Sequence, residues 1–158
     1  MSDHEAPPFA RALAAAGVLF FDRDGRVLLV QPAYKEYRDI PGGYLEPGET
    51  PYAACVREVR EELGIEPPIG RLLAVDWAPH PEEGDKVLFV FDGGVIDEET
   101  LKRISFADKE LTGYSFHPAE ELEGLLIERL ARRVKAAVAA REQGETVYLE
   151  HGQAVTTE

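Results

Sequence analysis

The sequence contains a single cysteine, Cys55, so no disulfide bond can form within one chain. Its place in the packed part of a predicted helix favours an inert buried side chain over a nucleophile. No apolar run approaches the roughly 18 residues of a membrane span, and the first residues are acidic rather than basic. We therefore expect a cytoplasmic protein without a membrane anchor.

Basic residues are also scarce, with 17 Lys and Arg against 30 Asp and Glu and a formal net charge of −13. A field of this sign repels polyanions, so neither nucleic acid nor an anionic membrane surface is expected as a partner. The four histidines show no metal-ligand spacing, which argues against a zinc site. A small nucleotide can still bind an acidic cleft where divalent cations reverse the local charge.

The length and composition predict one domain over residues 1–158. At 158 residues and 44% hydrophobic content, the chain can bury one core but is too short for two ordinary domains. Residues 1–10 and 152–158 are expected to fray at the two ends. There are no internal repeats and no low-complexity linker that would divide the chain further.

Hydrophobic patterning predicts alternating strands and helices. Strands are expected at residues 14–21, 26–31, 71–77, 86–91 and 112–117, with an edge strand at 146–150. Helices are expected at residues 51–63, 99–103 and 125–141, with a helical turn at 118–122. The turn Asp22-Arg23-Asp24-Gly25 should join the first two strands as a hairpin, and Asp92-Gly93-Gly94 should end the fourth. This order predicts an α/β protein.

The helix at residues 51–63 has clear boundary signals. It follows a tight Pro41-Gly42-Gly43 turn, where two glycines permit a close backbone approach to a ligand. Thr50 is a predicted N-cap with Pro51 at the first helical position, and Gly64 is a typical C-terminal stop.

Along this helix, side chains separate into an apolar and an acidic set. At about 100° per residue, one face contains Ala53, Val56, Val59 and Leu63, and the opposite face contains Glu58, Glu61 and Glu62. Like charges at this spacing each destabilise a helix by roughly 0.2–0.5 kcal/mol. The acids are therefore either a solvated surface or a site for Mg²⁺, or Mn²⁺ in its place, that binds a phosphate-bearing ligand.

The complete segment at residues 43–65, GYLEPGETPYAACVREVREELGI, favours the metal site. Gly43 is followed after five residues by Glu49, and after seven more by Arg57-Glu58, apolar Val59, Glu61-Glu62, Gly64 and apolar Ile65. In this pattern the chain resembles the Nudix hydrolase family, whose signature has each position filled in this way. The resemblance implies an α/β/α sandwich with a central mixed β-sheet and hydrolysis of a phosphoric anhydride bond.

The same resemblance implies roles for the residues of this segment. Glu58 and Glu62 should be metal ligands, with Glu61 as a further ligand or the activator of water, and the backbone carbonyl of Gly42 as another ligand. The ion would be Mg²⁺ or Mn²⁺.

Arg57 should orient Glu49 beneath the site, because an arginine fork can hold a carboxylate in one geometry. The alternative is an exposed ion pair of little energetic consequence.

The general base has two candidates, Glu61 within the signature and Glu110 outside it. In members of the family the base can lie on a separate loop, and Glu110 precedes the predicted strand at 112–117 in such a place. The other interpretation of Glu110 is a solvated loop acid.

Substrate contacts are less defined. Tyr34, Tyr37, Tyr44 and Trp77 lie on predicted loops or strand ends, where an aromatic face can stack on a base or simply pack. Lys35, Arg38 and Lys86 are candidate phosphate or carboxylate contacts, and each is otherwise a surface charge. Arg38 is the preferred candidate because it lies closest in sequence to the glycine turn.

Three functions are compatible with these residues. The first is hydrolysis of a nucleoside diphosphate linked to another moiety, such as ADP-ribose, and it is favoured because Pro79 and Pro81 lie near where ADP-ribose-cleaving relatives carry a proline. The second is a house-cleaning hydrolase of nucleoside triphosphates, and the third is a non-catalytic nucleotide sensor. The intact set of glutamates argues against the sensor. A homodimer is an open alternative to a monomer, with the apolar N-terminal strand as a possible edge.

Overall fold

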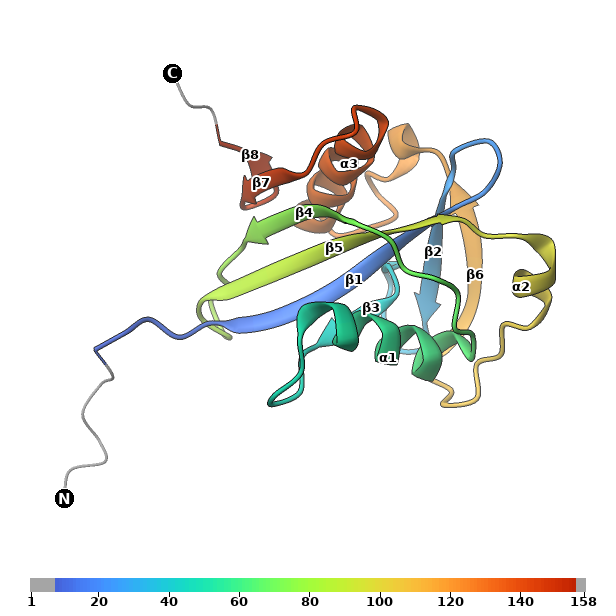
Figure 1. Ribbon diagram of the computed structural model, residues 1–158, viewed down its shortest axis with the longest axis horizontal. Coiled ribbons are helices and arrows are strands. Elements are labelled where there is room, and N and C mark those ends of the chain that lie inside the picture. The colour runs from blue at the N-terminus through green and yellow to red at the C-terminus, as the bar shows by residue number, and fades with distance from the viewer. Residues whose placement is uncertain (1–7, 156–158) are drawn as a thin grey trace.

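The computed structural model describes residues 8–155 and contains one mixed sheet with three helices (Figure 1). The strands are β1 (Leu13–Phe21), β2 (Val27–Pro32), β3 (Gly42–Tyr44), β4 (Leu72–Trp77), β5 (Lys86–Val95), β6 (Leu111–His117), β7 (Val147–Glu150) and β8 (Gln153–Ala154). The helices are α1 (Pro51–Leu63), α2 (Glu98–Lys102) and α3 (Glu128–Glu142), with a 3₁₀ turn at Ala119–Glu121. The sheet order is β6-β2-β1-β5-β4-β7-β8, and β3 pairs with β1.

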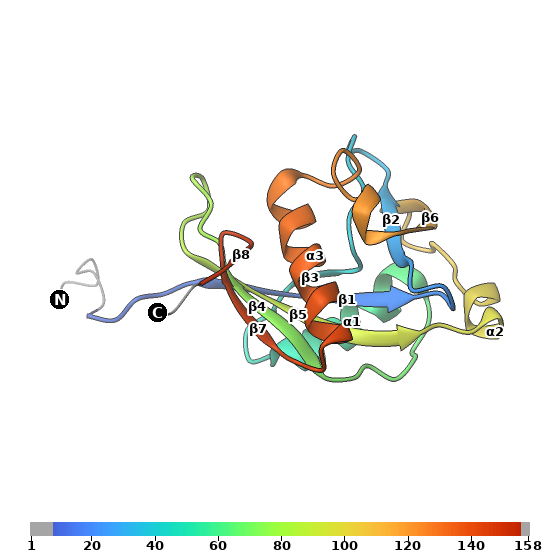
Figure 2. The same ribbon diagram turned by 90° about the horizontal axis from the view of Figure 1, so that it is seen from above.

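Helices α1 and α3 cover opposite faces of the sheet (Figure 2). Successive side chains of a strand point to opposite faces, and β1 supplies both cores in this way. Val18 and Phe20 pack in the cluster that contains α1, whereas Leu19 and Phe21 pack in the cluster that contains α3. The predicted α/β/α sandwich with a central mixed β-sheet is thus confirmed.

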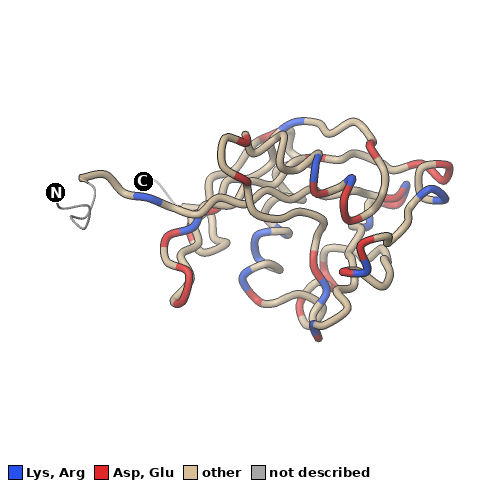
Figure 3. The backbone as a smooth tube through the Cα atoms, turned by 90° about the horizontal axis from the view of Figure 1, so that it is seen from below, with Lys and Arg blue, Asp and Glu red and all other residues tan. Residues whose placement is uncertain are grey.

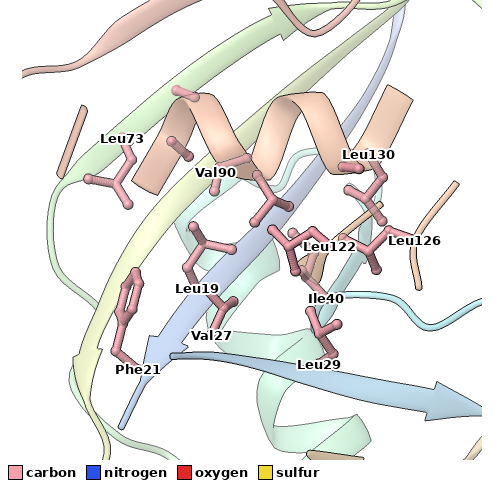
Figure 4. Packing of buried hydrophobic residues seen from close by; sticks show 14 of the residues in the cluster. Leu19, Phe21, Val27, Leu29, Ile40, Leu73, Val90, Leu122, Leu126 and Leu130 are labelled. Atoms are coloured by element: carbon pink, nitrogen blue, oxygen red, sulfur yellow. The ribbon is translucent and has the colours of Figure 1, made fainter. Parts of the chain in front are cut away.

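The core beneath α3 consists of Phe21 and mainly aliphatic side chains from the sheet, from the segment before the helix and from the helix itself (Figure 4). Leu122 and Leu126 precede α3, Leu130 lies in its first turn, and all three belong to the same buried cluster as Ile40 and Leu29. This packing holds the chain around residue 40 against α3, and so connects the segment that leads into β3 with the helix layer opposite α1.

Strand β1 has two partners along one edge. Its N-terminal half pairs with β3 through Ala15–Gly17, and its last residue, Phe21, pairs with Val27 of β2. On the other edge β1 pairs in parallel with β5 along its whole length. The sheet therefore splits between β2 and β3, and Gly42 and Gly43 of β3 lie at this split.

The α1 boundaries follow the predicted signals. The Thr50 hydroxyl accepts a hydrogen bond from the Ala53 amide at 3.0 Å, Pro51 begins the helix, and Gly64 ends it with a left-handed φ of 69°. The predicted hairpin turn is also present, because the Asp22 side chain accepts hydrogen bonds from the amides of Asp24 and Arg26.

Two predicted boundaries differ from the structure by three residues or more. The fourth strand does not end at Asp92-Gly93-Gly94 but continues as β5 to Val95, because the ladder with β1 resumes after an irregularity between Leu19 and Phe20. The C-terminal helix begins at Glu128 rather than residue 125, because the Leu125 carbonyl instead accepts a hydrogen bond from the Arg38 amide at 2.9 Å.

The C-terminal segment also differs from expectation. Strand β7 is not the sheet edge, because β8 pairs with it beyond Glu150. The fraying expected at residues 152–158 does not apply to Gly152, whose amide donates to the buried Asp76 carboxylate at 3.0 Å. The parts of this expectation that concern residues 1–7 and 156–158 lie outside the described residues. Within residues 8–155 no helix is long and apolar enough to cross a membrane.

Substitution of Gly93 tests how closely β5 packs against the core beside α1. A Cβ atom there would overlap the Phe20 ring in the core beside α1, whereas one at Gly113 would meet no atom within 4 Å. We expect Gly93→Ala to lower the free energy of unfolding by about 1–3 kcal/mol, the usual cost of overpacking a core. Gly113→Ala is the matched control and should change it little. Denaturant unfolding would measure both, and equal values would contradict the packing described for Gly93.

Candidate active site

The acidic residues of α1 lie against Gly42 and Gly43, which the structure places in strand β3, paired with β1, rather than in the predicted tight turn. The Gly42 amide donates a hydrogen bond to Glu62 Oε1 at 2.9 Å. A Cβ atom on Gly43 would overlap the Glu58 carboxylate, so only glycine leaves room for that side chain. Gly42 itself has a φ of 149° and packs on the backbone of Ala16, where β3 pairs with β1.

The helix faces differ from the sequence prediction. The buried residues of α1 are Ala54, Cys55, Val59 and Leu63, whereas Ala53 is exposed and Val56 is half-buried. Glu58 and Glu62 therefore border the packed face instead of projecting opposite to it. A simple helical wheel missed this because it does not include β3, which covers one flank of the helix.

Burial and like charge disfavour the ionised forms of both glutamates. Burial, together with the neighbouring carboxylates of Glu58, Asp39 and Glu110, raises the pKa of Glu62 to about 8, even though the hydrogen bond from the Gly42 amide lowers it. Burial likewise raises the pKa of Glu58, with added repulsion from Glu61 and Glu110 that the Arg57 cation only partly offsets. A cation between these carboxylates would relieve the repulsion.

Arg57 connects the acidic side chains to the loop before α1. Its Nε and Nη2 atoms donate to the two carboxylate oxygens of Glu49 at 2.7 and 3.0 Å. Nη2 also reaches the Tyr44 carbonyl at 3.1 Å, and Nη1 reaches Glu61 at 3.1 Å. The bond from Arg57, with one from the Glu46 amide, lowers the pKa of Glu49 to about 2. Arg57 thus holds the loop, the helix and the strand β3 together.

The residues fit a hard divalent cation without forming a complete cage. Among residues 8–155, no three His, Cys, Asp or Glu side chains converge as a ready-made site. Mg²⁺ is usually held by one or two carboxylates together with water and substrate phosphates, so Glu58 and Glu62 meet its needs. Glu61 is bound to Arg57 instead, and would have to rotate to join them.

A cavity of about 590 Å³ opens beside Gly42 and Gly43. It is bordered by Glu62, Gly42, Gly43 and Tyr44 on one side and by Glu110 on another. Its walls are largely apolar, from β1, β2 and β5. This size and lining are typical of a small-molecule site.

The two candidate bases are placed differently. Glu110 borders the cavity, on the loop before β6, and its charge acts on both Glu58 and Glu62. Glu61 lines neither this cavity nor the one described next, and its side chain is 48% exposed. The position of Glu110 depends on Lys109, which has a left-handed φ of 64°.

A second cavity of about 420 Å³ adjoins the first, and Lys35, Asp39 and Arg133 line both. The predicted substrate contacts Tyr37 and Arg38 lie in it, together with Lys35 and Lys86. Tyr34 and Tyr44 border the first cavity. Trp77 lines neither, since it ends β4, where its carbonyl accepts a hydrogen bond from the His151 amide at 2.8 Å.

Sequence reasoning missed Arg129 and Arg133 as lining residues of the second cavity. Arg133 lies within the buried stripe of α3, between Leu130 and Val134. The sequence does carry a signal for Arg133, because an arginine at an apolar position of an amphipathic helix indicates a buried, partnered charge.

Comparisons with known proteins bear on the family and the fold of this chain. The family model described as the NUDIX domain matches residues 11–140. An ADP-ribose pyrophosphatase of Methanocaldococcus jannaschii is 34% identical over 92 residues, which are 56% of this chain and 53% of that protein. A CTP pyrophosphohydrolase of Escherichia coli is 46% identical over 57 residues, 34% of this chain and 42% of that protein. The chain thus spans about half or less of the curated relatives it matches.

Among solved structures, one titled as a UDP-X diphosphatase aligns with a TM-score of 0.72 at 21% identity, covering 90% of this chain and 69% of that one. A MutT protein from Methanosarcina mazei Go1 aligns with a TM-score of 0.67 at 21% identity, covering 85% and 96%. At this level of identity the two structures support the fold.

Glu62→Gln tests the metal site without a substrate. The amide keeps the shape of the side chain but removes the charge that attracts a divalent ion, so we expect Mn²⁺ affinity to fall by at least about tenfold. Glu66→Gln, at an exposed acid after α1, is the control and should bind Mn²⁺ as the unchanged protein does. Calorimetric titration measures both, and equal affinities would remove Glu62 from the metal site.

Arg57→Lys tests the second layer of the site. Lysine keeps the charge but cannot form the fork with Glu49, so we expect turnover of a cleaved substrate to fall by about 10–100-fold. Arg60→Lys, one turn on and paired with Glu66 in solvent, is the matched control and should retain its rate. Steady-state assays at saturating metal measure this, with circular dichroism to check the fold. Normal turnover in Arg57→Lys would reduce Arg57 to a surface ion pair.

Proposed function

This chain belongs to the Nudix family, and we propose that it is a metal-dependent hydrolase that cleaves the diphosphate of a nucleoside diphosphate linked to another moiety. The observation that carries the proposal is the pair of adjoining cavities at the carboxylate cluster. Glu62 and Glu110 border the first cavity, and the second continues from it past Lys35 and Arg133. A ligand with groups on both sides of a diphosphate would use both spaces.

A divalent cation, bound by Glu58 and Glu62 and generally required in this family, would neutralise charge on the phosphate oxygens and make a water molecule easier to deprotonate. The chain supplies the remaining functions. Arg57 and Glu49 fix α1 relative to the loop before it, and Gly42 and Gly43 leave space for the carboxylates beside the backbone. The apolar walls of the first cavity suit a base or sugar face.

Glu110 is the proposed general base, and Glu61 is the alternative. A base must lie within reach of the attacking water, and the position of Glu110 at the cavity supports it. Glu61 is occupied by Arg57 at 3.1 Å and lies outside both cavities. A water attacking one phosphorus in line would give a nucleoside monophosphate and a phosphorylated remainder.

The curated relative named as an ADP-ribose pyrophosphatase supports a linked diphosphate as the substrate class. The relative named as a CTP pyrophosphohydrolase keeps a nucleoside triphosphate as the competing class. Both classes would use the same carboxylates, so the products decide between them.

Product analysis tests the proposal. The panel contains ADP-ribose, UDP-sugars, diadenosine polyphosphates and nucleoside triphosphates, each with Mg²⁺, with Mn²⁺ and with a chelator. We expect nucleoside monophosphate from a linked diphosphate, no product with chelator, and a loss of turnover in Glu110→Gln with unchanged Mn²⁺ affinity.

Release of pyrophosphate from triphosphates, without cleavage of any linked diphosphate, would replace the proposal with the triphosphate hydrolase. Binding without cleavage of any compound would favour a sensor. An unaltered rate in Glu110→Gln would return the role of base to Glu61 or to the metal alone.

A further inference from the structure

The second cavity is rich in positive charge, in contrast to the chain as a whole. Acidic and basic residues occur in several parts of the fold, and the net charge is −13 (Figure 3). Two acids, Glu36 and Asp39, line this cavity, against five cationic residues: Lys35, Arg38, Lys86, Arg129 and Arg133. A concave surface with an excess of cations attracts and holds anions.

Three of these five cations form no ion pair within the part of the chain that the structure describes. Lys86 already has partners within the protein, because it pairs with Glu83 and donates a hydrogen bond to the Tyr44 hydroxyl. In contrast, Lys35, Arg38 and Arg129 form no ion pair with any residue between 8 and 155. Three unpaired cations in one cavity repel one another unless an anion binds there.

Arg133 gives the cavity a fixed donor. Its side chain is only 9% exposed, and Nε donates to the fully buried Asp76 at 2.6 Å. Asp76 is itself held by the Gly152 amide at 3.0 Å. Neither Nη atom of Arg133 donates a hydrogen bond to the described chain, yet no buried side-chain nitrogen there lacks a partner. The Nη atoms therefore reach the solvent of the cavities that Arg133 lines.

We propose that the second cavity binds a phosphate monoester carried by the substrate at a point remote from the diphosphate that is cleaved. A guanidinium held in place by Asp76 presents its remaining N–H groups to phosphate oxygens, and Lys35, Arg38 and Arg129 supply the charge that a dianion needs. The cavities share Lys35, Asp39 and Arg133, so one molecule can occupy both.

This inference rests on the proposed function and narrows its substrate class. The favoured substrates are nucleoside diphosphate conjugates with an additional phosphate. A volume of about 420 Å³ suits one compact anion rather than an extended polymer.

Matched substrate pairs that differ by one phosphate test the inference. They are ADP-ribose and its 2′-phosphate, NAD⁺ and NADP⁺, and dephospho-coenzyme A and coenzyme A. We expect kcat/KM to be at least about tenfold higher for the phosphorylated member of one or more pairs, because each charge-assisted hydrogen bond contributes a factor of roughly ten or more.

Arg129→Gln and Arg38→Gln each remove one cavity cation, and should lower this preference by about tenfold through KM. Arg103→Gln, which makes the same charge change next to α2 and outside both cavities, should leave the preference unaltered. An active enzyme with no preference in any pair, or a preference that neither cavity variant changes, would overturn the inference while leaving the proposed function intact.

If no pair is cleaved, the proposed function fails for these compounds, and calorimetric binding of the same pairs with Mg²⁺ decides the inference separately. Tighter binding of a phosphorylated member, weakened by Arg129→Gln, would support the phosphate subsite. Equal binding of both members in every pair would reject it.

Discussion

The contact between α1 and Gly42 and Gly43 of β3 is the constraint on which the rest of the site depends. Glu62 accepts the Gly42 amide, and Glu58 occupies the space that a side chain on Gly43 would fill. The two carboxylates are thereby kept beside a backbone strand and away from free solvent, where their pKa values rise. Such an arrangement is costly without a cation, which explains why the same residues suit divalent metal and phosphate together.

The architecture supplies this contact from both faces of the sheet. Along one edge, β1 pairs first with β3 and then with β2, so the sheet is open between these two strands. Helix α1 packs on one face of the sheet there. On the other face α3 brings Arg133 towards the same opening through the core around Ile40 and Leu130. The carboxylates of Glu58 and Glu62 and the guanidinium of Arg133 therefore come from helices on opposite faces of the sheet.

Much of this could be predicted because the signals are local. Residues close together in the sequence set the helix caps, the hairpin turn and the spacing of the glycines and glutamates. The structure at these places could therefore be predicted from the sequence. The later start of α3 and the length of β5 depend on distant partners, the Arg38 amide and the ladder with β1. Predicting the flank of α1 on which Glu58 and Glu62 lie would have required knowledge of β3. Predicting the basic cavity would have required the tertiary structure that brings α3 and the loop around residue 38 to line one space.

Locating a bound metal ion and a bound diphosphate tests the proposed site most directly. A crystal structure with Mn²⁺ and a non-hydrolysable methylene analogue of ADP-ribose, collected for anomalous scattering, would locate both. We predict an anomalous peak within coordination distance of Glu58 and Glu62, with the analogue's phosphates bound to it and its remaining groups in the adjoining cavities. A Mn²⁺ peak elsewhere, with those carboxylates free and the cavities empty, would contradict the account.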